Sequence, residues 1–421
     1  MTAVVGVGLI GLGTVGAAVA RRLVAEWEML GRRAGVTPAL RRVAVRDPAR
    51  PREVALPRVA LDADPEGLVD DDAVAVVVEV MGGVDRATSL MARALRAGKP
   101  VITANKAALA AHGLELAALA ADRGVSLRYE AAVGAGLPVV ALLRDSLRGD
   151  RVSSMEMIIN GTTNVILSRM ETGGISFAEA LAEAQARGFA EADPSADVDG
   201  HDAAAKLLLL SRLAFDSPLT IESVDTTGIG AVDAADVACA RGLGGAVKLV
   251  GHAQRTGAGV ALSVRPTVVL PGHPLSGVDD AENALVLRSD LAGSVTMRGP
   301  GAGGDSTASA VLSDIVATLR APGRAPELPS DNLVAGDDGA VERRGYIRVR
   351  LRGVAEAGEL VIQALEDRGI PVTASLGAPG GDLALLTDPV QPKMLERATE
   401  TLDSLAVVDG VQTVMDCVGG G

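Results

Sequence analysis

The chain has 421 residues, of which 48% are hydrophobic, and a formal net charge of −13. That length and composition can bury two or three cores, which excludes a disordered protein. The acidic balance, without any Lys/Arg-rich run, argues against nucleic-acid and anionic-membrane surfaces, so small molecules are the expected partners. Cys239 and Cys417 show no metal-like spacing, which indicates a reducing, cytoplasmic setting rather than a disulfide framework.

An uncharged stretch over residues 3–20 has the length of a membrane span or signal peptide. Its five glycines would weaken a lone helix, and no basic residue precedes it. We therefore expect no membrane association, and we assign the stretch to a strand, a turn and the start of a helix.

Residues 1–135 alternate short Val/Ile runs with stretches of helical period, which predicts an α/β domain with a doubly wound, Rossmann-type parallel sheet. The predicted strands are 4–10, 42–45, 74–80, 100–103 and 125–129. The predicted helices are 15–30, 86–97 and 107–123.

Residues 136–304 begin with helices and continue with strands predicted at 247–254, 260–269, 284–288 and 294–298, which indicates an α+β substrate-binding and dimerisation domain. Ser176 and Glu179 have the spacing of a capping box that opens a helix ending near Gly188. The Pro-, Gly- and Asp-rich stretch 321–342 is expected to be a linker.

A third, smaller domain is predicted over residues 343–421. Strands at 346–352, 372–376, 383–387 and 411–415 and helices at 360–367 and 393–405 give the order βαββαβ, typical of a small regulatory module.

The turn after the first predicted strand reads Gly11-Leu12-Gly13-Thr14-Val15-Gly16 and opens a predicted helix. Here Gly11 permits a tight turn, Gly13 lets the backbone approach a pyrophosphate, and Gly16 lets the helix pack on the strand. The N–H groups of Thr14 and Val15 at the helix N-terminus favour phosphate oxygens. The alternative is a tightly packed turn without a ligand.

The ends of the next strands carry further candidates for coenzyme binding. Arg46 suits the 2′-phosphate of NADP, whereas Asp47 equally suits the ribose hydroxyls of NAD. Arg46 could also be a solvated surface residue, so NADP is only slightly favoured. Gly82, Thr103 and Lys106 follow later strands, at the sheet edge where parallel sheets bind ligands. Taken alone, Lys106 could also be an ordinary solvated lysine at a helix start.

The densest group of ionisable residues lies within residues 188–206. Its carboxylates are Glu191, Asp193, Asp197, Asp199 and Asp202. A helix from Gly200 makes Asp202 and Lys206 neighbours on one face, about 5–6 Å apart at Cβ. The apolar run at 207–210 favours an interior cleft over a surface ion pair. There an ammonium can protonate a carbonyl oxygen as hydride arrives, while carboxylates hold an amino-acid ammonium.

Seven motifs in order resemble those of homoserine dehydrogenases across almost the whole chain. Beside the glycine turn they are EVMGG at 79–83, TANK at 103–106, YEAAVGAGLP at 129–138, INGTTN at 159–164, GFAEADPSADVDGHDAAAK at 188–206 and GAGGDSTASAV at 301–311. The resemblance implies reversible NAD- or NADP-dependent reduction of aspartate β-semialdehyde to homoserine, in threonine, methionine and isoleucine biosynthesis.

The resemblance also implies roles for individual residues. Glu191, Asp197 and Asp202 would bind the amino-acid end of the substrate. Lys206 would exchange the proton at the reacting oxygen, and Lys106 would place nicotinamide and substrate and share that proton transfer.

Other matching positions imply contacts with the coenzyme and a cation. Gly188 and Gly303 would approach the nicotinamide closely, and a helix at 305–320 would return to the first domain. A monovalent cation, usually sodium, would be bound by oxygen alone. Its implied ligands are Glu130 and the backbone carbonyls of Val133, Ala135 and Leu137.

The predicted module over 343–421 resembles an ACT domain, which implies threonine as an effector. Its first loop, Val354-Ala355-Glu356-Ala357-Gly358-Glu359, lacks the Asp and Pro usual before that glycine. This departure argues against amino-acid sensing and leaves assembly, as a homodimer or homotetramer, as the other role.

Two other classes are weighed against this interpretation. An aspartate-semialdehyde dehydrogenase needs an activated thiol near the coenzyme, and neither cysteine lies in a suitable loop. A non-catalytic amino-acid or nucleotide sensor on the same scaffold has no need of a proton-transferring lysine paired with a carboxylate.

Overall fold

The computed structural model describes residues 3–420 apart from 53, 57, 58, 258, 325, 327, 328, 330–332, 337, 338, 340, 354, 355 and 379. It divides into two compact units. Unit 1 comprises Met1–Arg151, Leu208–Ile221 and Gly299–Asn332, and unit 2 comprises Val152–Leu207, Glu222–Arg298 and Leu333–Gly421. The residues Val354 and Ala355 of the predicted module loop lie outside the described residues.

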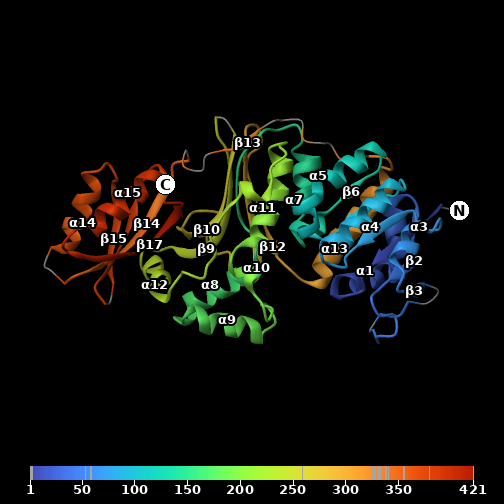
Figure 1. The fold of residues 1–421 in the computed structure, drawn as a ribbon, viewed down its shortest axis with the longest axis horizontal. Coiled ribbons are helices and arrows are strands. Elements are labelled where there is room, and N and C mark those ends of the chain that lie inside the picture. Colours follow the sequence, from blue (N-terminus) through green and yellow to red (C-terminus); the bar gives the residue numbers. More distant parts are fainter. Residues whose placement is uncertain are drawn as a thin grey trace. The chain divides into compact units, whose positions relative to one another are not determined.

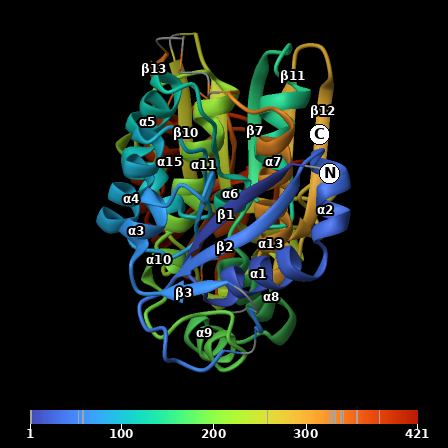
Figure 2. The same cartoon turned by 90° about the vertical axis from the view of Figure 1, so that its right-hand side faces the viewer.

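Unit 1 contains a six-stranded parallel sheet in the order β3-β2-β1-β4-β5-β6. The strands are β1 (Val4–Ile10), β2 (Thr37–Ala44), β3 (Ala60–Asp62), β4 (Val76–Glu79), β5 (Val101–Thr103) and β6 (Leu127–Arg128). Figure 2 shows β1, β2 and β3 side by side. The strand order reverses at β1, which makes the ends of β1 and β4 the point where such sheets bind ligands. The predicted parallel Rossmann-like sheet is confirmed.

Unit 1 also carries helices from distant parts of the chain. They are α1 (Thr14–Ala25), α2 (Trp27–Ala34), α3 (Pro65–Asp70), α4 (Asp85–Arg96), α5 (Lys106–Asp122), α6 (Glu130–Val133), α7 (Val139–Ala141), a π-helix (Leu142–Ser146) and α13 (Gly304–Arg320). Val311 and Ile315 of α13 pack with Val7 and Leu9 of β1 in one buried cluster. Helix α13 therefore completes the core of this unit.

The single helix expected over residues 15–30 is wrong, because the chain leaves helical geometry at Glu26, where φ is −118° and ψ is 22°. The break starts a second helix, α2, whose Leu30 packs into the same core as Leu23 of α1. Tertiary packing thus overrides a helical pattern that continues through residue 26.

Unit 2 is organised around an 11-stranded mixed sheet. Its main path runs β12-β11-β7-β9-β10-β17-β14-β16-β15, and β8 and β13 also pair with β10. The strands are β7 (Val152–Ile158), β8 (Asp225–Thr226), β9 (Ala246–Arg255), β10 (Gly259–Val269), β11 (Glu282–Ser289), β12 (Gly293–Pro300), β13 (Val334–Ala335), β14 (Arg344–Leu351), β15 (Val372–Ala378), β16 (Asp382–Thr387) and β17 (Val408–Val418).

The last four named strands and two helices have the order βαββαβ (Figure 1). Their core includes Ile347, Val361, Leu365 and Leu385. They do not form a separate sheet, because β17 pairs in parallel with β10 from Thr267–Asp416 to Val269–Val418. Residues from the predicted substrate domain and from the predicted module therefore share one sheet.

The helices of unit 2 are α8 (Gly161–Gly173), α9 (Phe177–Ala186), α10 (Ser195–Val198), α11 (His201–Ala214, of which Leu208 onward belongs to unit 1), a 3-10 turn (Ile221–Ser223), α12 (Ala234–Gly242), α14 (Ala357–Glu366) and α15 (Pro392–Asp403). The predicted capping box at the start of α9 is present, since Ser176 and Glu179 exchange side-chain to backbone hydrogen bonds. In the described part of the chain, every helix is too short or too polar to cross a membrane.

Candidate active site

The turn after β1 needs glycine at Gly11 and Gly16, because of the backbone conformation at Gly11 and the close packing at both positions. Gly11 has φ of +102°, and a Cβ there would lie 2.7 Å from the Val80 carbonyl oxygen. A Cβ on Gly16 would lie 2.2 Å from the Gly11 carbonyl oxygen, so the helix packs directly on the turn. A Cβ on Gly13, by contrast, would meet no described atom within 4 Å. Space beside Gly13, at the N-terminus of α1, can therefore admit a phosphate group.

A second helix begins beside this turn. Gly303 precedes α13 with φ of +126°. A Cβ on the next residue, Gly304, would lie 2.9 Å from the Thr14 side chain at the start of α1. Two helix N-termini thus approach the same glycine turn, which strengthens its attraction for an anionic ligand.

The ends of β4 and β5 are joined by a buried carboxylate. Glu79 is fully buried and accepts hydrogen bonds from Thr103 Oγ1 at 2.6 Å and from the Met81 amide at 2.8 Å. Burial raises the pKa of Glu79, and these hydrogen bonds oppose that rise. Thr103 Oγ1 also accepts from the Asn105 amide, and Asn105 Nδ2 donates to the Gly83 carbonyl at 2.6 Å. One network therefore fixes both strand ends and the loop between them.

This network orients the start of α5. The Asn105 side chain caps that helix by accepting from the Ala108 amide at 3.1 Å, and Lys106 is its first residue, partly buried. The candidates Gly82, with φ of +76°, and Thr103 lie at the same sheet edge. The parts played by Glu79 and Asn105 were not predicted, although Asn directly before a helix is a signal for a cap.

The two candidates for coenzyme discrimination lie just beyond β2. Arg46 and Asp47 are both exposed. The Asp47 carboxylate accepts from the Ala49 amide at 2.9 Å, and the Asp47 carbonyl accepts from Arg52 at 2.6 Å. Asp47 thus stabilises the turn that follows β2 through these hydrogen bonds, whereas the Arg46 side chain is exposed to solvent.

Unit 2 holds the predicted lysine and its carboxylate partner. Lys206 Nζ lies 2.8 Å from Asp202 Oδ2 and donates to the Ile159 carbonyl at 2.9 Å. The Lys206 and Asp202 side chains are only 12% and 7% exposed, so this is a buried pair at the start of α11. Asn160 Nδ2 donates to Asp202 Oδ2 at 2.9 Å and to Asp197 Oδ1 at 2.6 Å. The structure therefore brings Asp197, Asp202 and Lys206 into one hydrogen-bonded group.

The remaining acidic candidates lie apart from that group. Glu191 is exposed, and its backbone carbonyl accepts from Gln185 Nε2 at 3.0 Å. Within the described residues its carboxylate makes no contact with Asp202 or Lys206. Gly188, at the end of α9, has φ of +76°, a conformation that favours glycine.

The candidate cation loop follows β6. Burial raises the pKa of Glu130 to about 7, and its two carboxylate oxygens accept from the Val140 and Ala141 amides at 2.8 and 2.7 Å. Ala135 has φ of +49°. A Cβ on Gly134 would lie 2.2 Å from the Leu137 carbonyl oxygen, so the loop is tightly folded there. The described residues contain no group of three or more His, Cys, Asp or Glu suited to a metal. A cation held by the single carboxylate of Glu130 and the carbonyls of Val133, Ala135 and Leu137 would not form such a group.

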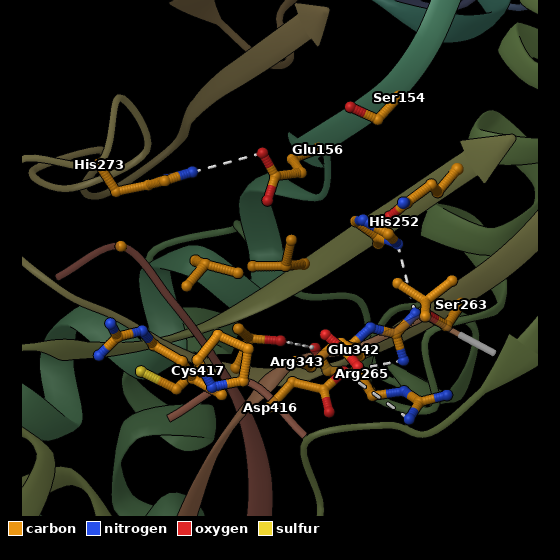
Figure 3. Close-up of a pocket in the computed structure, with 18 of the residues that line it drawn as sticks. Ser154, Glu156, His252, Ser263, Arg265, His273, Glu342, Arg343, Asp416 and Cys417 are labelled. Carbon is orange, nitrogen blue, oxygen red and sulfur yellow. Dashed lines mark hydrogen bonds and ion pairs between the residues drawn. The ribbon is translucent and has the colours of Figure 1, made fainter. Parts of the chain in front are cut away.

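Unit 2 also has a partly open pocket of about 590 Å³ (Figure 3). Glu156 of β7 is paired there with Arg288 at 2.5 Å and with His273 at 3.4 Å, and Asp416 is paired with Arg343 at 3.4 Å. Among the described residues, those lining this cavity include none of the predicted site residues. Its walls come from the sheet and from the C-terminal residues 341–344 and 416–419.

Comparison with known proteins identifies the family. The family model described as homoserine dehydrogenase matches residues 138–316, and the model for the NAD binding domain of homoserine dehydrogenase matches residues 11–130. The homoserine dehydrogenase of Corynebacterium glutamicum is 38% identical, with 98% of this chain and 95% of that protein covered.

Solved structures agree with these matches. The crystal structure of a homoserine dehydrogenase from Thiobacillus denitrificans superposes with a TM-score of 0.92 at 35% identity, covering 100% of both chains. A hyperthermophilic archaeal homoserine dehydrogenase mutant in complex with NADPH has a TM-score of 0.62 at 28% identity, covering 76% of this chain and 99% of that one. The chain belongs to the homoserine dehydrogenase family of NAD(P)-dependent oxidoreductases.

Proposed function

We propose that Lys206 is the proton donor when hydride reduces the C4 carbonyl of aspartate β-semialdehyde to the alcohol of homoserine. The reduced nicotinamide supplies the hydride to carbon, and a proton must reach oxygen. The observation that carries this role is the buried ion pair of Lys206 with Asp202. A carboxylate 2.8 Å from the ammonium holds it in one orientation until the proton moves.

The remaining hydrogen-bonding capacity of Lys206 suits the reacting oxygen. An ammonium has three donors, and two of them serve Ile159 and Asp202. The third is proposed to donate to the substrate oxygen and to stabilise the charge that develops there. In the direction of homoserine oxidation, the neutral amine takes the alcohol proton. Lys106, at the start of α5, is proposed to place substrate and nicotinamide and to share the proton transfer.

The amino-acid end of the substrate is proposed to bind the carboxylates around Lys206. Asp197 and Asp202 lie in one hydrogen-bonded group, and carboxylate oxygens are strong acceptors for an ammonium. Glu191 is proposed as a third contact, made when substrate is present.

The glycine turn of unit 1 is proposed to hold the pyrophosphate of the coenzyme. Open space beside Gly13 and the two nearby helix N-termini support this assignment. NADP is favoured over NAD because Arg46 is exposed at the end of β2 and suits a 2′-phosphate, and a related archaeal enzyme is in complex with NADPH. The other proposed coenzyme contacts are Gly11, Thr14, Val15, Gly16, Gly82, Thr103, Lys106, Gly188 and Gly303.

A monovalent cation, sodium by chemistry, is proposed to bind the loop formed by Glu130, Val133, Ala135 and Leu137. The left-handed conformation of Ala135 helps to turn successive carbonyls in one direction. Thermal unfolding in sodium chloride and in choline chloride at equal ionic strength tests this site. A higher Tm in sodium is expected, and equal values would remove the cation from the proposal.

The C-terminal residues 343–421 are proposed to form an ACT-like module that supports assembly as a homodimer or homotetramer in the cytoplasm. The order βαββαβ supports the module. Threonine is the effector to be tested, by its effect on initial rate, and sedimentation gives the oligomeric state. Pathway placement in threonine, methionine and isoleucine synthesis follows from the proposed substrate.

Homoserine oxidation, followed by nicotinamide absorbance, tests the role of Lys206. Lys206→Ala is expected to lower kcat by about 10²–10⁴-fold, whereas Lys393→Ala, an exposed lysine on α15, should leave it unchanged. A Lys206→Ala enzyme with parental kcat would refute the assignment. A larger loss in Lys106→Ala than in Lys206→Ala would make Lys106 the main proton donor.

A further inference from the structure

The junction between β7 and α8 places one amide at the centre of the acidic group. Asn160 is 4% exposed and lies at the N-cap of α8. Its Oδ1 accepts from the Thr163 amide at 2.8 Å and from Thr163 Oγ1 at 3.0 Å. Because Oδ1 must face these donors, the orientation of the amide is determined and Nδ2 points the other way.

The two hydrogens of that Nδ2 go to two carboxylates. One reaches Asp197 at 2.6 Å and the other reaches Asp202 at 2.9 Å. The preceding residue, Ile159, accepts from Lys206 through its carbonyl. Two consecutive residues therefore hold both members of the buried ion pair, Asp202 through a donor and Lys206 through an acceptor.

We infer that Asn160 is a positioning residue, which holds Asp197 and Asp202 side by side and thereby fixes Lys206 in its proton-donating place. The inference rests on the proposed role of Lys206. Two neighbouring carboxylates repel each other, and a hydrogen-bond donor held between them offsets that repulsion. Asn160 supplies such a donor to each, without adding a charge of its own.

The residue type is specific for this task. Serine can cap a helix as well as asparagine does, but it has a single hydroxyl hydrogen and a shorter reach. Aspartate keeps the shape and the cap acceptor, but it replaces the donor with a third negative charge. Neither can accept from Thr163 and at the same time donate to both Asp197 and Asp202.

These differences define the experiment on the full-length enzyme. Asn160→Ser should keep the helix cap and lower kcat for homoserine oxidation by about 10–100-fold, with a raised KM for homoserine and an unchanged KM for the coenzyme. Asn160→Asp should also move the rising limb of the kcat–pH profile to higher pH, because added negative charge holds the proton on Lys206. Ser176→Ala, which removes the cap of α9, is the control and should lower Tm without changing kcat.

A second variant tests the repulsion directly. Asp197→Asn removes one of the two charges and also a proposed contact of the substrate ammonium, so in the Asn160→Ser background it should recover part of the lost kcat while raising the KM for homoserine further. If Asn160→Ser lowers Tm like Ser176→Ala but keeps parental kcat, KM and pH profile, the residue is only a cap and the inference is wrong. If Lys206→Ala is itself fully active, the proposed proton donor has failed instead, which distinguishes the two failures.

Discussion

Thr103 donates a 2.6 Å hydrogen bond to Glu79, and this bond links the carboxyl ends of two adjacent parallel strands. The Glu79 side chain is fully buried, and hydrogen-bond donors offset the free-energy cost of removing its carboxylate from water. The Thr103 hydroxyl also accepts from the backbone amide of Asn105, so the position of the residue that caps α5 depends on Thr103 as well. A single side chain thus connects the sheet to the helix that begins with Lys106.

Replacing Thr103 by valine keeps the volume and removes the hydroxyl. The buried carboxylate of Glu79 then loses a donor, which should destabilise the protein by about 1–3 kcal/mol and raise the KM for the coenzyme. Urea unfolding and initial rates measure the two effects. Thr103→Ser keeps the hydroxyl and is the control; if serine and valine behave alike, the hydrogen bond does not have this role.

Arg46→Ala tests the coenzyme preference. Losing a charge-assisted contact with the 2′-phosphate should reduce kcat/KM for NADPH by about 10–100-fold, with little change for NADH. Arg32→Ala, another exposed arginine in the same unit, should affect neither coenzyme. An equal loss with both coenzymes would mean that Arg46 does not recognise the phosphate.

The pH dependence of stability should report on Glu156. Burial by itself would raise the pKa of Glu156, but the neighbouring His273 and Arg288 side chains lower it from 4.5 to about 2. A depressed folded-state pKa gives stability that is present above pH 4.5 and is lost as the pH falls toward 2. Glu156→Gln should therefore cost roughly 3 kcal/mol at pH 7 and flatten the fall of Tm in that acidic window.

Calorimetry measures Tm of the parent and of Glu156→Gln between pH 7 and about 2. Glu359→Gln, an exposed glutamate on α14, is the control. A parental slope of Tm against pH retained in Glu156→Gln would show that another group titrates there.

Arg348 joins α12 to the last strands of unit 2. Its guanidinium contacts Asp236 at 2.7 Å, Asp382 at 2.6 Å and Asp233 at 2.7 Å. Arg348→Met would leave the buried carboxylates of Asp236 and Asp382 without this cation, at an expected cost of about 3–5 kcal/mol. Arg352→Ala breaks an exposed pair with Asp409 and should cost less than about 1 kcal/mol. Chemical unfolding compares them, and similar losses would contradict the importance of burial.

Local patterns in the sequence predict much of unit 1. The first strand has its predicted bounds, Val4–Ile10, because an apolar run ends at glycines that only a turn explains. In unit 2, Lys206 and Asp202 are likewise found as an ion pair, because residues four apart on a helix lie on the same face.

Contacts between distant residues could not be predicted in this way. Strand β7 (Val152–Ile158) was missed because Ser153, Ser154 and Glu156 interrupt its apolar pattern. Asn160 is 42 positions from Asp202, so no local pattern predicts the hydrogen bond between them. The break at Glu26 has the same origin, since it serves packing against a core assembled from other segments.

Among the described residues, one edge of β10 is covered in turn by three short pairings, with β13 near Gly259, with β8 near Ser263 and with β17 near Thr267. No single partner protects its whole length, so a shortened chain ending before residue 408 would expose free amides and carbonyls at Thr267–Val269. Such an open edge invites intermolecular pairing and aggregation. The carboxyl-terminal residues therefore protect the sheet of unit 2 from intermolecular pairing, and removing them should promote aggregation.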